Sequence, residues 1–354
     1  VGGYLKSESI DLGNGIKLVN NSQPYWSSNS SGSTLIRYSN GIIIKYNENR
    51  EAEWGKVIGA GENDKVTAVV EASDGGYIVG GDFYSSSIDL GNGITLTNNN
   101  FNNDGMIIKY NENGEVEWAK AVGGRGTDEI TSISATIDGG CIAVGNFRSK
   151  SIDLGNEITL TSDNDYNGMI IKYNADGEAE WAQKIDGTGM DFIKSVSETS
   201  DGGYIIGGYS STKSLDLGND ITLTTNNSSN FDGIIIKYNA EGKTECAKII
   251  GGTEREEINS VAKTKDGGYI VGGDFCSSSI DLGNGITLTN PNGTYTRTDG
   301  MIIKFNANLE TEWAQSIGGT QYEHITSITE TSNGEYIVGG YFDSATAEID
   351  EKII

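Results

Sequence analysis

The chain has 354 residues, of which 50 are acidic and 25 basic, so its formal net charge at pH 7 is -25. This excess of negative charge repels phosphate backbones and anionic lipids, which argues against nucleic-acid binding and membrane-surface binding. The longest purely apolar runs have three or four residues, far too few to span a membrane, so membrane insertion is not expected. Hydrophobic residues make up 36% of the chain, enough at this length to fill one or two cores, so a disordered chain is not expected.

A repeated unit is the dominant pattern along the chain. The tag Ile-Asp-Leu-Gly-Asn begins at Ile10, Ile88, Ile152 and Ile280, and Leu215 opens a variant copy. A second tag, such as GMIIKYN at 105, follows each time, and an apolar segment such as EVEWAKAVGG from 115 comes next. Five copies follow one another without a linker, which indicates one supersecondary unit stacked on copies of itself.

Each unit is expected to contain four strands. In one unit the short β-branched segments 129–136, 141–147, 169–173 and 178–185 are separated by turn residues such as Asp138-Gly139-Gly140. The long connection carries the first tag, and in two other copies its turn is Asn92-Gly93 or Asn284-Gly285. Because Asn-Gly between alternating apolar residues favours a tight hairpin, each connection is expected to hold a small hairpin of its own.

The unit predicts an all-β fold, namely a five-bladed β-propeller with four-stranded antiparallel blades. A sheet with two apolar faces needs a neighbour on both sides, and closure into a ring supplies one. An open β-solenoid is the rival, but its coils take roughly 20 to 30 residues. We expect a single domain over 1–354, with units at about 1–65, 66–129, 130–192, 193–257 and 258–324 and closing strands in 325–354.

Strands from both termini are expected to close the ring. The segment VGGY at 1–4 matches VGGD at 79–82 and VGGY at 338–341. The last hairpin, within 325–342, would then be completed by strands near 42–59. One copy of the second strand is surplus, and it either frays or covers an edge, or pairs with another copy of the chain.

The run DGGYIVGG at 74–81 and the segment DGMIIKYNENGEVEWAKAVGG at 104–124 resemble the bacterial β-propeller repeat named SBBP, for seven-bladed β-propeller. The resemblance spans nearly the whole chain and implies secreted or envelope-associated bacterial proteins. The chain departs from the family name in having five units. A composition rich in Gly, Asn, Ser, Thr and Tyr is also typical of such proteins, so an extracellular or cell-surface location is expected.

Strand parity predicts that all long or variable segments lie on one face of the ring. These segments are 20–39, 97–104, 161–167, 224–232 and 289–299. Irregular loops on a rigid scaffold often carry recognition, although solvated filler is the alternative. The candidate ligand-binding residues are the aromatic side chains in and beside these loops: Tyr25, Trp26, Phe101, Tyr166, Phe231 and Tyr295.

Polar residues that recur in every unit are interpreted as structural, because one reaction centre needs different groups in one place. The recurring acids are expected to cap turns or pair with the recurring lysines, although a ring of carboxylates that attracts a cation is the alternative. The three cysteines, Cys141, Cys246 and Cys276, are expected to be unbridged hydrophobic residues. The acids are Asp64, Asp128, Asp191, Glu256 and Glu323, and the lysines are Lys45, Lys109, Lys172, Lys237 and Lys304.

A weak calcium motif is the single cofactor signal. Asp163, Asp165 and Asn167 fit the opening of a calcium-binding loop, in which alternate oxygen ligands surround the ion. The twelfth position is Asn174 rather than glutamate, so the bidentate carboxylate is missing, and turn formation is the alternative interpretation. No other cofactor is predicted.

Catalysis is not expected. His324, the single histidine, is interpreted as an exposed loop residue without marked relay partners. A glycoside hydrolase would need a carboxylate pair, and Glu71, Glu198 and Glu330 occupy equivalent positions at the strand rim. This class is retained as the alternative.

The sequence therefore predicts a non-catalytic extracellular module that presents loops to a protein or glycan, or that serves as a structural module of a surface assembly. Lectin-type carbohydrate binding is an alternative within this class. Self-association through the terminal strands is a further predicted interaction.

Overall fold

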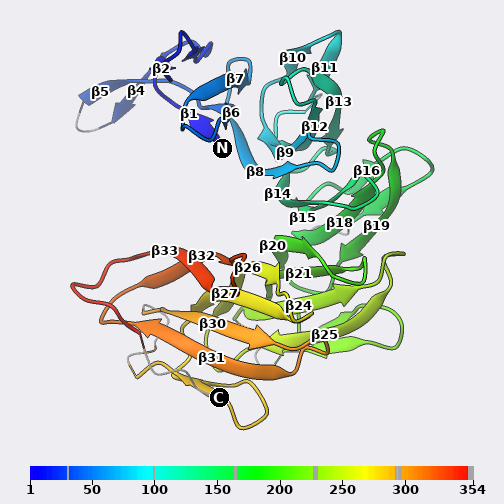
Figure 1. The fold of residues 1–354 in the computed structure, drawn as a ribbon, viewed down its shortest axis with the longest axis vertical. Coiled ribbons are helices and arrows are strands. Elements are labelled where there is room, and N and C mark those ends of the chain that lie inside the picture. The colour runs from blue at the N-terminus through cyan, green and yellow to red at the C-terminus, as the bar shows by residue number, and fades with distance from the viewer. Residues whose placement is uncertain are drawn as a thin grey trace. The chain divides into compact units, whose positions relative to one another are not determined.

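The structure is a computed structural model of the chain, and it describes residues 1–29, 32–98, 100–162, 166–225, 230–291, 293 and 297–349. Every regular element within these ranges is a β-strand, which confirms the all-β class (Figure 1). Among the same residues, no helix has the length and apolarity of a membrane span.

Four-stranded antiparallel sheets repeat along the chain, as the unit predicted. We name the four strands of each sheet, in chain order, the inner, second, third and outer strand, and they pair in that order. Each inner strand begins two residues before the predicted start of its unit. The strands are β8 (Asp64–Glu71), β9 (Tyr77–Phe83), β12 (Asp104–Tyr110) and β13 (Val116–Val122); β14 (Asp128–Ala135), β15 (Cys141–Phe147), β18 (Asn167–Tyr173) and β19 (Ala179–Ile185); β20 (Asp191–Glu198), β21 (Tyr204–Ser210), β24 (Asp232–Tyr238) and β25 (Thr244–Ile250); β26 (Glu256–Lys263), β27 (Tyr269–Phe275), β30 (Asp299–Phe305) and β31 (Thr311–Gly318).

Small hairpins occupy the five long connections, which confirms that prediction. Their turns place Asn92 and Asn284 at φ of 53° and 54°, the left-handed conformation that an Asn-Gly turn requires. A further hairpin lies in the segment 20–39. The hairpins are β2 (Ser9–Asp11) with β3 (Lys17–Val19), β4 (Tyr25–Asn29) with β5 (Gly32–Ile36), β10 (Ser87–Gly91) with β11 (Ile94–Thr97), β16 (Ser151–Asp153) with β17 (Thr159–Thr161), β22 (Ser214–Asp216) with β23 (Thr222–Thr224) and β28 (Ser279–Asp281) with β29 (Thr287–Thr289).

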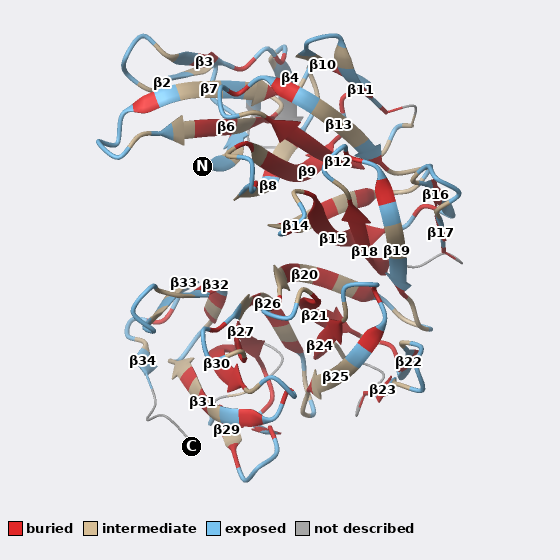
Figure 2. Cartoon of the chain, turned by 45° about the vertical axis from the view of Figure 1, so that its right-hand side comes forward, coloured by how far each residue is buried: buried red, intermediate tan, exposed pale blue. Residues whose placement is uncertain are grey.

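The core lies at the second and third strands of each sheet. Every residue of β15, β21, β24, β27 and β30 is buried, which explains their continuous apolar runs (Figure 2). Inner and outer strands instead alternate between buried and partly exposed positions. The three cysteines form no disulfide, and Cys141 and Cys276 are buried, as expected for small hydrophobic residues.

The first and last sheets are incomplete. β1 (Gly2–Leu5) pairs with β6 (Asn40–Tyr46), which pairs with β7 (Ala52–Ile58). β32 (Glu323–Glu330) pairs only with β33 (Tyr336–Phe342), and β34 (Glu348–Ile349) adds to β31. The pairing of β33 with β6 that would close the ring is absent from the described strands, because β1 holds that edge of β6. Ring closure and the count of five blades therefore stay predictions.

The chain divides into two compact units. One comprises Val1–Asn164 with Ile171–Ala182, and the other comprises Asp165–Ile170 with Gln183–Ile354, so the division passes through β18 and β19. That all loops share one face, and that the units form a single domain, stay predictions.

Candidate functional site

One cross-strand pair changes its chemistry from repeat to repeat. The second residue of each inner strand lies between a buried acid and a buried valine or isoleucine, which recur in every repeat. It opposes a residue near the end of the second strand. A position that changes while its neighbours are kept is a candidate for recognition. The pairs are Lys65 with Asp82, Glu129 with Asn146, Phe192 with Tyr209, Glu257 with Asp274, and His324 with Tyr341.

Four of these pairs make a specific contact. Lys65 forms an ion pair with Asp82 at 3.1 Å, and Asn146 donates to Glu129 at 2.9 Å. Burial raises the pKa of Asp82 to about 6 despite its pairing with Lys65. The rings of Phe192 and Tyr209 lie 5.0 Å apart, and those of His324 and Tyr341 are stacked at 4.7 Å.

An aromatic cluster surrounds Phe192 in the second of the two compact units. Its ring stacks on Tyr166 with centroids 5.4 Å apart, and Phe231 contacts Tyr209 edge-on at 5.1 Å. Tyr166 and Phe231 come from two different connections, whereas Phe192 and Tyr209 belong to β20 and β21. The structure thus brings two of the predicted ligand-binding residues together, with two aromatic residues that the sequence did not single out.

Two cations lie over the faces of this aromatic cluster. The Arg255 guanidinium is 5.8 Å from the Phe231 centroid, and the Lys194 ammonium is 5.5 Å from that of Tyr209. Arg255 also forms an ion pair with Glu257. The arrangement combines flat apolar surface with fixed charges, which suits a ligand that has both polar and apolar groups.

His324 is not an exposed loop residue, so that interpretation is wrong. It lies on β32, half-buried, and its Nδ1 is 2.9 Å from Oδ2 of Asp274 on β27. Asp274 also accepts hydrogen bonds from Asn259 and from the Ile325 N–H. The hydrogen bond to Asp274 raises the pKa of His324, although burial opposes the rise. His324 therefore links the last hairpin to the preceding sheet.

Three of the other predicted aromatic residues, Tyr25, Trp26 and Phe101, belong to the other compact unit. Tyr25 stacks on Tyr38 with centroids 4.7 Å apart, and its neighbour Trp26 is 69% exposed. Phe101 is 90% exposed. Tyr295 lies outside the described residues.

The repeated acids are buried, and four of them bind the loop that follows the second strand of their sheet. Asp64 accepts hydrogen bonds from the N–H groups of Tyr84 and Ser85 at 3.0 and 3.1 Å and from the Ser85 hydroxyl at 2.7 Å. Asp128, Asp191 and Glu256 have equivalent donors. Glu323 is buried as well, but its oxygens have no hydrogen-bond partner among the residues described. This geometry favours the structural interpretation over a cation-attracting ring.

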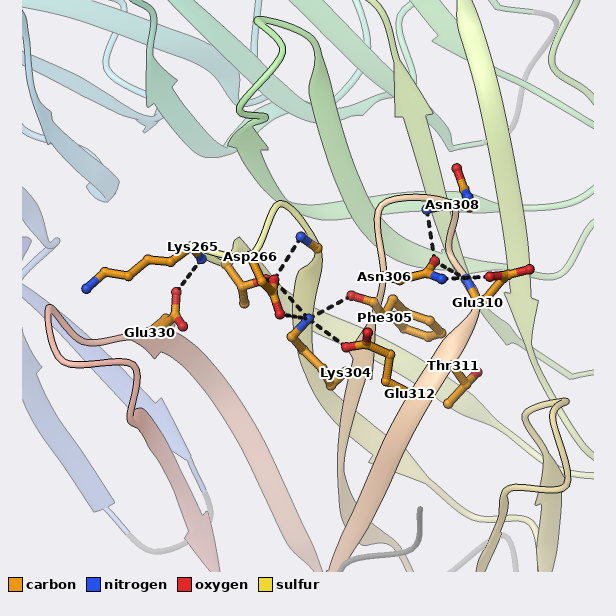
Figure 3. A network of polar contacts seen from close by, with 12 residues as sticks. Lys265, Asp266, Lys304, Phe305, Asn306, Asn308, Glu310, Thr311, Glu312 and Glu330 are labelled. Carbon is orange, nitrogen blue, oxygen red and sulfur yellow. Dashed lines mark hydrogen bonds and ion pairs between the residues drawn. The ribbon is translucent and has the colours of Figure 1, made fainter.

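The repeated lysines form ion pairs with a different set of carboxylates. Lys304 contacts Asp266 and Glu312, each at 2.9 Å, and donates to the Phe305 carbonyl oxygen (Figure 3). Lys109, Lys172 and Lys237 bridge an acid of the tight turn and one of the outer strand in the same way. Of the two roles expected for the recurring acids, pairing with the recurring lysines is therefore not the one that these residues have, because the acids bind loop N–H and hydroxyl groups instead. Both sets stabilise the sheet, in separate networks.

The calcium motif is only partly described. Asp163 and Asp165 lie outside the described residues, and Asn167 begins β18 with 2% of its surface exposed. The described residues include no group of three or more His, Cys, Asp or Glu side chains that could hold a metal ion.

Four candidate site residues were not among those predicted from the sequence, namely Phe192, Lys194, Tyr209 and His324. The aligned repeats contain a signal for these residues. The second residue of the inner strand changes from Lys65 to Glu129 between repeats, whereas the residues on either side of it keep their chemistry.

Comparisons with known proteins identify no family. No family model matches the chain, and no curated protein matches it. The solved structures similar to the chain include two at 9% identity. A protein of unknown function from Bacteroides caccae has a TM-score of 0.37 over 78% of this chain and 89% of its own. A protein of unknown function from Dyadobacter fermentans has a TM-score of 0.40 over 89% of this chain and 98% of its own. Likeness at this level supports no conclusion about fold or function.

Proposed function

We propose that the chain is a non-catalytic, extracellular or cell-surface binding module of the β-propeller type, whose five repeats act as five blades. The observation that carries the proposal is the divergence of the five cross-strand pairs within otherwise repeated sheets. Conserved packing beneath varied chemistry is what a rigid scaffold for recognition needs.

A glycan or a protein surface is the proposed ligand. The aromatic cluster of Tyr166, Phe192, Tyr209 and Phe231 supports lectin-type binding in particular, because sugar rings pack on aromatic faces while fixed charges bind their polar groups. Aromatic residues with arginine are also common at protein interfaces.

Replacement of Arg255 by alanine is expected to weaken binding at least tenfold, because this exposed side chain spans the aromatic cluster. Binding is measured on an array of bacterial and host glycans and by pull-down from cell surfaces. Phe101→Ala, which removes an isolated exposed ring, is the control and is expected to bind normally. Saturable binding that survives Arg255→Ala, or no saturable binding by the native chain, would contradict the proposal.

We also propose that β33 closes the ring by taking the place of β1 on β6. Residues 338–342 repeat the sequence of residues 1–5, which contain β1, with one substitution, and this supports the exchange. An added Cβ at Gly2 of β1 would lie 2.5 Å from Val69, whereas one at the equivalent Gly339 of β33 meets nothing within 4 Å.

Gly339→Ala tests this closure. If β8 covers β33, the alanine is expected to cost about 1 to 3 kcal/mol in stability, as should Gly272→Ala, whose Cβ would lie 2.7 Å from Ile325. Thermal unfolding of both variants provides the measurement. An unchanged midpoint for Gly339→Ala beside a lowered one for Gly272→Ala would rule closure out, and light scattering separates closure within one chain from pairing of two copies.

A further inference from the structure

A second buried polar position recurs beside the acid that begins each inner strand. It is the first residue of the third strand, and it is at most 6% exposed in every repeat. The N–H of the inner-strand acid donates to the carbonyl oxygen just before this position, as Asp128 does to Asn103 at 2.8 Å. Two repeats have asparagine here and three have aspartate: Asn40, Asn167, Asp104, Asp232 and Asp299.

Asp128 has the environment of an ionised carboxylate. Its oxygens accept hydrogen bonds from the N–H groups of Gly124, Arg148 and Ser149 at 2.9, 3.0 and 3.1 Å and from the Ser149 hydroxyl at 2.5 Å. Donors of this kind stabilise the charged form. They also occupy the lone pairs that a cation would need, and Ca²⁺ takes about six to eight oxygen ligands.

Asp104 has the opposite environment. Its side chain is 5% exposed, and its Oδ1 has no hydrogen-bond partner within the described chain. A second charge buried beside Asp128 would be uncompensated and therefore costly. Asn40 and Asn167 have the shape of a protonated aspartic acid without its charge, and they occupy the same place in two other repeats. The position thus requires the shape and not the charge.

We propose that Asp104 is a proton-binding site, held as a neutral carboxylic acid beside ionised Asp128 in mildly acidic solution. The chain therefore takes up a proton when this part of it folds.

The electrostatics of the pair agree with this assignment. Burial raises the pKa of Asp104 to about 7, and the charge of Asp128 adds to the rise. Burial raises the pKa of Asp128 too, but its hydrogen bonds act in the opposite direction. The carboxylate of Asp82 on β9 is bound to Lys65 and Asn103.

The proton makes stability depend on pH in an unusual direction. An unfolded aspartate has a pKa of about 3.9, so between about pH 4 and pH 7 the folded chain binds more protons than the unfolded chain. The contribution of Asp104 is therefore complete below pH 4 and is lost as the pH rises through 7.

Asp104→Asn tests the proposal in the full chain. From pH 5 to pH 8 the unfolding constant of the native chain is expected to rise on the order of a hundredfold more than that of the variant, as a pKa near 7 in place of 3.9 requires. Urea unfolding across this range gives the constants, and carboxyl NMR of the native chain gives the pKa of Asp104 directly. The matched variant Asn167→Asp creates a new pair beside Asp191 and is expected to introduce the same pH dependence.

Three outcomes would overturn the proposal. Asp104→Asn could destabilise the chain equally at all pH values, which would make Asp104 an ordinary hydrogen-bonding residue. The NMR titration could place the pKa of Asp104 near 4. Added Ca²⁺ could raise the stability of the native chain and not of Asp104→Asn, which would make the pair a cation site.

Discussion

Replacement of Gly268 by alanine is expected to lower the free energy of unfolding by about 3 kcal/mol, because the added Cβ would lie 2.2 Å from the carbonyl oxygen of Phe305 on the adjacent strand. Backbone cannot move aside as a side chain can. The equivalent Gly76, Gly140 and Gly203 are equally confined, with carbonyl oxygens 2.4, 2.1 and 2.3 Å from the added atom. Glycine is thus required here by the close approach of a third strand.

The last hairpin supplies the matched control. Glu335 occupies the position of Gly268, and no described third strand pairs with β33. Glu335→Ala is therefore expected to change stability by less than about 0.5 kcal/mol. Urea unfolding monitored by tryptophan fluorescence compares the two variants, and equal stability of Gly268→Ala and the native chain would refute the steric argument. Where a third strand approaches, this position is a glycine. Glu335 therefore limits the proposed pairing of β33 with β6 to the part of β33 beyond residue 336.

Replacement of Lys304 by methionine is expected to cost about 2 to 3 kcal/mol. The Lys304 side chain is 3% exposed, and its ammonium is shared by Asp266 and Glu312, which would lose their counter-charge. The loss is smaller than the roughly 3 to 5 kcal/mol of a fully buried pair, because both carboxylates are about half exposed and become hydrated. Thermal unfolding gives the change.

Lys45→Met is the control for this variant. Lys45 is 31% exposed and forms an ion pair with Glu53 alone among the described carboxylates, so the expected cost is under about 1 kcal/mol. Similar losses for both variants would show that the buried network does not stabilise the sheet.

The pH dependence of the Lys304 network has the ordinary sign. Burial acts to raise the pKa of Asp266, but its hydrogen bonds to Thr264 and Lys304 outweigh that effect and lower the pKa to about 2. The stabilisation by this ion pair is present above about pH 4 and is lost as the pH falls through 2. The stabilisation by the proton on Asp104 is instead lost as the pH rises through about 7. One pH titration of stability therefore distinguishes the two effects.

The sequence by itself determined the strands, their order within each sheet and the small Asn-Gly hairpins. These features depend on short-range chemistry: alternating apolar residues, tight turns and strands joined by a few residues, repeated until the pattern is unmistakable. Tyr166 and Phe231 were also identified from their place in the connections.

Only the tertiary structure decided which residues meet between sheets. His324 reaches Asp274 across 50 positions of the sequence, and Phe192 meets rings from two connections and a neighbouring strand. The edge of β6 likewise could receive either of two nearly identical strands, and the structure places β1 there. Such contacts depend on how whole sheets pack. The repeats are so alike that the local sequence of one sheet does not specify which other copy it packs against.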